Sequence, residues 1–270
     1  MAILKLKAPC KDYIWGGNRL REEYGKQLDS DRIAESWELS CHKDGQSVIT
    51  GGEFDGKTLS DYIAAKGKGV LGKNCGRFEY FPVLIKLIDA KDNLSVQVHP
   101  SNEYALRVEG EYGKTEMWYV VATNEGAHLR SGFAKRVTPA EYAASVEDNT
   151  ITDLLADYAI RPGDVFFLPA GRVHSIGAGA FIAEIQQTSD ITYRIYDFNR
   201  RDANGNTLTP MDYIMLLPTP EDDLNQTASF PGGFTNVTID YPIQMEAHEQ
   251  PNVTNALSFN AVMEDGTDDY

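Results

Sequence analysis

Two segments of the sequence place imidazole groups where they could take part in metal chemistry. In one, the apolar run 165–168 ends in the turn Pro169-Ala170-Gly171, and His174 follows three residues later on the returning chain. In the other, Gln97 and His99 end a strand-like apolar segment and stand two residues apart. Since residues two apart on a strand share one face, Gln97 and His99 can point into one cavity. A neutral imidazole is a common metal ligand, so both segments are candidate parts of a metal site.

The spacing of these segments resembles the two motifs of the cupin superfamily. The second motif consists of Gly, five residues, Pro-x-Gly, two residues and His, and the segment from Gly163 to His174 matches it residue for residue. The first motif usually has His-x-His, whereas this chain has Gln97 before His99, and the carboxylate of the motif corresponds to Glu116. Two imidazoles, one carboxylate and one amide oxygen suit Zn²⁺, or Mn²⁺, Fe²⁺ or Co²⁺. We therefore expect one metal ion per chain, with zinc as the expected ion.

Longer stretches around these residues resemble the type I mannose-6-phosphate isomerases of the compact bacterial class. The similar segments span roughly residues 10–215 and include Trp15-Gly16-Gly17, 35–38, 81–90, 94–100, 113–119 and 169–197. The resemblance implies a mainly β cupin, that is, a jelly-roll β-barrel with a few peripheral helices. It also implies zinc ligation by Gln97, His99, Glu116 and His174, and an active-site role for Arg194.

Three cationic side chains are expected to converge near the metal. Lys86 interrupts the apolar run 83–88, and a buried lysine is costly unless it is paired or lines a wet cavity. Arg194 shares a strand face with Thr192 and Tyr196, and Lys114 alternates onto one side with Glu116 and Trp118 if that strand begins at 114. An anionic sugar phosphate that passes through an enediolate needs such cations, so we predict that Lys86, Lys114 and Arg194 bind substrate and take part in catalysis. We place Trp15 at the substrate site as well.

The implied reaction is the aldose–ketose isomerisation of mannose 6-phosphate and fructose 6-phosphate through a cis-enediol. The general base stays open between Glu184, Asp190, a metal-bound hydroxide and a lysine of lowered pKa. The alternative function is a non-catalytic cupin that binds a sugar phosphate, because one fold hosts many functions. A metal-dependent dioxygenase is disfavoured, since those sites usually leave a three-residue facial triad open and Gln97 would add a fourth ligand.

The elements that must position these residues are mostly short strands separated by turn residues. We expect strands at 83–88, 94–98, 117–121, 165–168, 180–185 and 191–196. Helices are expected at 58–65 and 101–108, with another that opens at Thr138-Pro139. We divide the chain into a metal-binding cupin domain at 1–215 and a C-terminal β-region, abbreviated or truncated, at 216–270.

The overall charge and the cysteines limit the partners and the compartment. A formal net charge of −15 disfavours nucleic acid and anionic membrane surfaces as partners. Three scattered cysteines without a C-x-x-C pair are typical of a reducing compartment, which favours the cytoplasm. We therefore expect a cytoplasmic monomer or homodimer whose partner is a small sugar phosphate.

Overall fold

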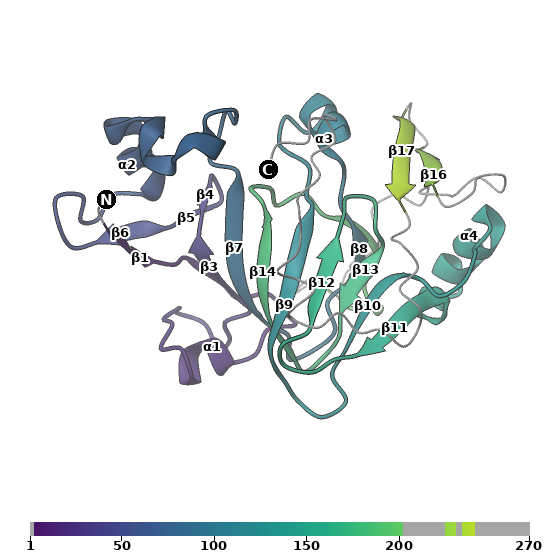
Figure 1. Ribbon diagram of the computed structural model, residues 1–270. Coiled ribbons are helices and arrows are strands. Elements are labelled where there is room, and N and C mark those ends of the chain that lie inside the picture. The colour runs from purple at the N-terminus through teal and green to yellow at the C-terminus, as the bar shows by residue number, and fades with distance from the viewer. Residues whose placement is uncertain (1–2, 202–224, 231–233, 241–270) are drawn as a thin grey trace.

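Short apolar runs separated by turn residues fold here as two antiparallel sheets, in a computed structural model that describes residues 3–201, 225–230 and 234–240 (Figure 1). The six-stranded sheet has the order β12 (Val165–Leu168), β9 (Glu116–Thr123), β14 (Ala180–Gln187), β7 (Val83–Asp89), β3 (Glu35–Leu39) and β2 (Cys10–Lys11). The five-stranded sheet has the order β11 (Leu155–Ala159), β10 (His128–Phe133), β13 (His174–Ile176), β8 (Val96–Val98) and β15 (Tyr193–Tyr196). This two-sheet arrangement confirms the mainly β jelly roll.

The smaller elements lie outside these two sheets. Three two-stranded pairs are β1 (Lys5–Lys7) with β6 (Val48–Thr50), β4 (Cys41–His42) with β5 (Gly45–Gln46), and β16 (Asn225–Phe230) with β17 (Phe234–Asp240). The helices are α1 (Arg19–Glu22), α2 (Leu59–Lys66), α3 (Asn102–Val108) and α4 (Pro139–Glu147), with 3-10 turns at Lys68–Leu71, Lys73–Cys75 and Ile151–Leu154. In the described part of the chain, no helix is long and apolar enough to cross a membrane.

The main core fills the space between the two sheets. Residues from the six-stranded sheet, such as Trp118 and Ile182, pack there against Leu129 and Ile176 of the five-stranded sheet. Burial alternates along the strands, as the two-residue period of a strand requires. This period turns Lys86 inward on β7, so a charged side chain lies on a largely apolar face of the sheet.

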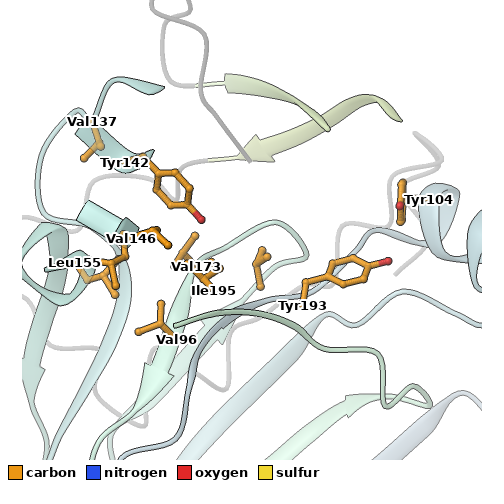
Figure 2. Close-up of a cluster of buried hydrophobic side chains, with 11 residues drawn as sticks. Val96, Tyr104, Val137, Tyr142, Val146, Leu155, Val173, Tyr193 and Ile195 are labelled. Atoms are coloured by element: carbon orange, nitrogen blue, oxygen red, sulfur yellow. The ribbon is translucent and has the colours of Figure 1, made fainter. Parts of the chain in front are cut away.

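A second core covers the opposite, outer face of the five-stranded sheet (Figure 2). Tyr142 of α4 and Tyr104 of α3 belong to this cluster together with the strand residues Val96, Tyr193 and Ile195. Because alternate residues of β8 and β15 are anchored in it, their neighbours in sequence must point to the inner face. The cluster therefore fixes the direction of the polar side chains on that inner face.

The capping residues start the helices where the sequence predicts. The side chain of Thr138 accepts from the backbone N–H of Glu141, whose carboxylate accepts in return from the N–H of Thr138, with Pro139 at the first turn. Thr58 forms the same reciprocal pair for α2, and Ser101 caps α3. Strands at 83–88, 117–121, 165–168 and 180–185 are confirmed, while the segments expected at 94–98 and 191–196 begin two residues later. The domain boundary at 215/216 lies outside the described residues.

Candidate active site

Three residues from the two sheets bring metal-ligating atoms together between them. His99 directly follows β8, Glu116 opens β9 and His174 opens β13. Nε2 of His99 lies 3.5 Å from Oε2 of Glu116, and Nε2 of His174 lies 3.3 Å from Oε1 of the same carboxylate. One ligand atom from each of the three residues lies within 4.8 Å of the others, and all three residues are buried. The arrangement is a possible metal site.

The second nitrogen of each imidazole determines which tautomer is present. Nδ1 of His99 lies 2.9 Å from the carbonyl of Ile191, and Nδ1 of His174 lies 2.8 Å from the carbonyl of Arg172. Because a carbonyl oxygen only accepts, both Nδ1 atoms carry the proton and donate. The lone pairs on the two Nε2 atoms are then directed to the shared space beside Glu116, as metal ligation requires.

The buried polar atoms of these three residues also indicate a site for a cation. Nε2 of His99 and both carboxylate oxygens of Glu116 are buried without a hydrogen bond. Buried polar atoms in proteins are almost always hydrogen-bonded or bound to an ion. Burial also lowers the pKa of His99 well below its ordinary value and that of His174 to about 3, so both are neutral at pH 7. Neutral imidazoles with free lone pairs suit a divalent metal.

Gln97 lies beside His174 on the inner face of the five-stranded sheet. It pairs with His174 across β8 and β13 and with Arg194 across β8 and β15, and cross-strand partners share a sheet face. Nε2 of Gln97 lies 3.4 Å from Nε2 of His174. A half-turn of the amide would present its oxygen to the same space instead.

A buried network of charges extends from the ligand group along the inner face of the six-stranded sheet. Lys114 Nζ lies 3.4 Å from Oε2 of Glu116. Trp118 donates its indole N–H to Glu184 over 3.0 Å, and Lys86 Nζ lies 3.7 Å from the other oxygen of Glu184. Burial raises the pKa of Glu116 and the neighbouring carboxylate of Glu184 raises it further. Burial also raises the pKa of Glu184, but Lys114, Lys86 and the side-chain hydrogen bonds with Trp118 and Glu116 together bring it below its usual value.

Lys86 extends the network to two more carboxylates. Its Nζ lies 3.4 Å from Glu35 and 3.5 Å from Asp190, in addition to Glu184. With Glu116, four carboxylates face the two ammonium groups of Lys86 and Lys114. The fully ionised network therefore lacks two positive charges, which a single divalent cation would supply.

The structure brings together most of the residues that the sequence predicts for the site. One connected group contains the three candidate ligands and, in addition, Gln97, Lys86, Lys114, Glu184 and Asp190. Arg194 lies on the same sheet face as Gln97, on the edge strand β15, with 42% of its side chain exposed and Nη1 at 4.0 Å from Asp197. Trp15 is half-buried, packs against the core between the sheets and lies 5.6 Å from the ring of Tyr13.

Two residues of the charged network were not predicted from the sequence as site residues. Glu35 is buried beside Lys86, and the indole ring of Trp37 lies 4.7 Å from Lys86 Nζ. A signal was available, because a Glu and a Trp two residues apart on one strand share a face, and a glutamate on a buried face needs a cationic partner.

Comparisons with known proteins indicate the family of this chain. A profile of phosphomannose isomerase type I, catalytic domain, matches residues 3–149. A mannose-6-phosphate isomerase of Streptococcus mutans is 42% identical over 202 residues, and the isomerase ManA of Bacillus subtilis is 40% identical over 203 residues; each match covers 75% of this chain. The solved mannose 6-phosphate isomerase from Bacillus subtilis superposes with a TM-score of 0.71 at 31% identity and covers 88% of this chain and 79% of that one.

The matches cover only part of the length of each relative. The chain spans about 63% of the length of the curated relatives from Streptococcus mutans and Bacillus subtilis. The matching profile covers the segment that carries Gln97, His99 and Glu116, and His174 lies beyond it. With the profile, the sequence identity and the superposition in agreement, the chain belongs to the phosphomannose isomerase type I family.

Proposed function

We propose that this chain is a metal-dependent aldose–ketose isomerase that interconverts mannose 6-phosphate and fructose 6-phosphate. The observation that carries the proposal is the contact of Glu116 with two kinds of group. It faces the imidazoles of His99 and His174 at 3.3–3.5 Å and the ammonium of Lys114 at 3.4 Å. A passive sugar-binding site would need no buried cation beside its ligand carboxylate, whereas an enediolate needs positive charge close to its oxygens. The names of the relatives support the same reaction.

We assign the metal to Gln97, His99, Glu116 and His174, with zinc as the ion. The donor set of nitrogen and oxygen atoms suits zinc. When bound, the ion would act as a Lewis acid on a sugar oxygen beside the carbon that loses its proton.

The remaining residues have different roles toward an anionic substrate. Arg194, on the accessible edge strand, is the cation that an incoming phosphate reaches from solvent or that faces the enediolate once it has formed, and a guanidinium binds such groups with two parallel hydrogen bonds. Lys86 and Lys114 hold positive charge in the interior. Between the two candidate carboxylate bases, Asp190 keeps 33% of its side chain exposed and Glu184 only 4%, so we assign proton transfer between C1 and C2 to Asp190.

The net charge of the chain bears on the partner that it binds. A net charge of −15 supports a small-molecule partner over nucleic acid or a membrane surface. We place the enzyme in the cytoplasm, as a monomer or homodimer.

The test is formation of fructose 6-phosphate from mannose 6-phosphate by chelator-stripped protein, with and without added Zn²⁺. We expect activity to vanish on stripping and to return with the metal, and His174→Ala to abolish both metal retention and turnover. His128→Ala is the matched control, because His128 lies on the same sheet outside the ligand group and keeps 26% of its side chain exposed. Stoichiometric metal with no product would instead support the non-catalytic sugar-phosphate-binding cupin.

A further inference from the structure

Lys86 is held in place by groups from three different parts of the chain. Nζ faces carboxylates of Glu35 on β3, Glu184 on β14 and Asp190 after β14, at 3.4, 3.7 and 3.5 Å. The ring of Trp37 covers it at 4.7 Å from its centroid. A lysine side chain has four rotatable carbon–carbon bonds, so such enclosure removes conformations that the free side chain would populate.

Glu35 and Trp37 form a unit on β3 that faces this lysine. Trp37 is the register partner of Lys86 across β3 and β7, and Glu35 lies two residues earlier on the same face. The indole N–H of Trp37 donates to Oε2 of Glu35 over 2.7 Å, and the same oxygen is the one that lies 3.4 Å from Lys86. Both residues are buried, at 6% exposure for Glu35 and 0% for Trp37. The indole thus orients the carboxylate, and the carboxylate and ring together orient the ammonium.

The other partners of Lys86 cannot replace this unit. Asp190 is the most exposed of the three carboxylates, with 33% of its side chain accessible, and water weakens its attraction for the ammonium. Glu184 is shared between two lysines, because Lys114, which lies beside Glu116, also acts on its carboxylate. Glu35 is the buried carboxylate on the side of Lys86 away from the ligand group.

We propose that Glu35 and Trp37 are positioning residues that hold Lys86 as a fixed cation against Glu184 and Asp190. This inference rests on the proposed isomerase function. It assigns Lys86 to charge stabilisation and removes it from the candidates for the general base, because a base must be able to give up its proton.

The electrostatics agree with this geometry. Burial by itself lowers the pKa of Lys86, but Glu35, Glu184 and Asp190 outweigh burial, and the pKa lies above its ordinary value. The phenol of Tyr13 is the further titratable group that acts in the same direction. Glu35 has the largest effect of the four.

The decisive variant is Glu35→Gln, which keeps an oxygen to accept from Trp37 and removes only the charge. We expect kcat/KM to fall about 10- to 100-fold in the otherwise unchanged protein. In a Lys86→Met background the same change should cost less than about twofold, because a residue that acts through Lys86 has nothing left to position. Glu38→Gln is the matched control: Glu38 lies on the same strand, pairs with Lys26 at 2.6 Å and lies outside the network, so activity should persist.

An equal loss in both backgrounds would overturn the inference, since Glu35 would then act independently of Lys86. Metal content and the melting temperature of each variant distinguish a misfolded protein from a mispositioned lysine. Should Glu35→Gln fold poorly, Glu35→Asp keeps the charge on a shorter side chain and should lie between wild type and Gln in activity.

A second readout does not depend on turnover. In protein with ¹³C-labelled lysine, the signal of Lys86, assigned by its absence from Lys86→Met, should begin to titrate at a lower pH in Glu35→Gln than in wild type. Identical titration curves would contradict the positioning role. If wild-type protein formed no fructose 6-phosphate, the proposed function would fail, and this titration would still decide whether Glu35 holds the charge of Lys86.

Discussion

The ammonium of Lys114 lies 3.4 Å from Oε2 of Glu116, the carboxylate that both imidazoles of the ligand group also face. The two residues stand two apart in sequence and are both buried. A cation next to a ligand carboxylate competes with the metal for that carboxylate and, at the same time, adds positive charge where an enediolate would form.

Replacement of Lys114 by Met should therefore separate catalysis from metal binding. We expect kcat/KM to fall about 100-fold or more, because the interior loses one of its two ammonium groups, while the zinc content stays at one per chain. Enzyme kinetics and elemental analysis on the same preparation check this. Lys91→Met, at an exposed position, is the control. Loss of zinc from Lys114→Met would show that Lys114 orients Glu116 as a ligand.

The amide of Gln97 should contribute less to metal affinity than either imidazole. Gln97→Ala is expected to weaken zinc binding about 10- to 100-fold, whereas His99→Ala should remove stoichiometric binding, because a neutral amide oxygen is the weakest donor of the set. Competition with a chromophoric chelator measures both affinities. Equal losses in the two variants would contradict this ranking.

The metal-free protein should lose stability as the pH falls below about 6.5. Burial lowers the folded-state pKa values of His99 and His174, so both stay neutral in the folded state, while the unfolded chain takes up protons on them below about 6.5. Because the pKa of Glu116 is raised in the folded state, its carboxyl group binds about one proton there over the same pH range. Near pH 5.5 the unfolded state therefore binds about one proton more, and the free energy of unfolding falls by about 1 kcal/mol per pH unit. Denaturant titrations with chelator at pH 7.0 and 5.5 measure the difference, and equal stability at the two values would contradict the expectation.

Gly113 should tolerate no side chain. A Cβ there would lie 2.4–2.5 Å from backbone atoms of Pro100, Ser101 and Asn102, which cannot move as a flexible side chain would. We expect Gly113→Ala to lower the free energy of unfolding by about 1 to 3 kcal/mol. Gly69→Ala is the matched control, because a Cβ at Gly69 meets nothing within 4 Å. Thermal unfolding of the two variants tests the contrast, and equal melting temperatures would count against the close approach.

The local part of the site could be predicted from the sequence, because strand periodicity and turn spacing determine it. The two-residue period places Gln97 on the face that His174 shares, and the turn before His174 brings that strand back beside β8. Cap residues such as Ser101 and Thr138 likewise act on their own helices and are visible in the sequence.

The long-range part could not be predicted in the same way. The pairing of Lys86 with Glu35 depends on the register between β3 and β7, and no local signal specifies that register. The accessibility of Arg194 follows from the place of β15 at the edge of its sheet, which is also a property of the whole topology. The boundary proposed at 215/216 stays a prediction.

Glu116 belongs to one sheet, while His174 belongs to the other and His99 directly follows its strand β8, and no backbone ladder links the two sheets among the described strands. An ion bound by all three would thus act as a cross-link between the halves of the sandwich, as a disulfide does between distant segments of a chain. Amide protons of β8, β9 and β13 should then exchange with solvent together and slowly in the loaded protein, and separately and faster once the ion is removed. The same ion would set both the chemistry and the cooperativity of unfolding.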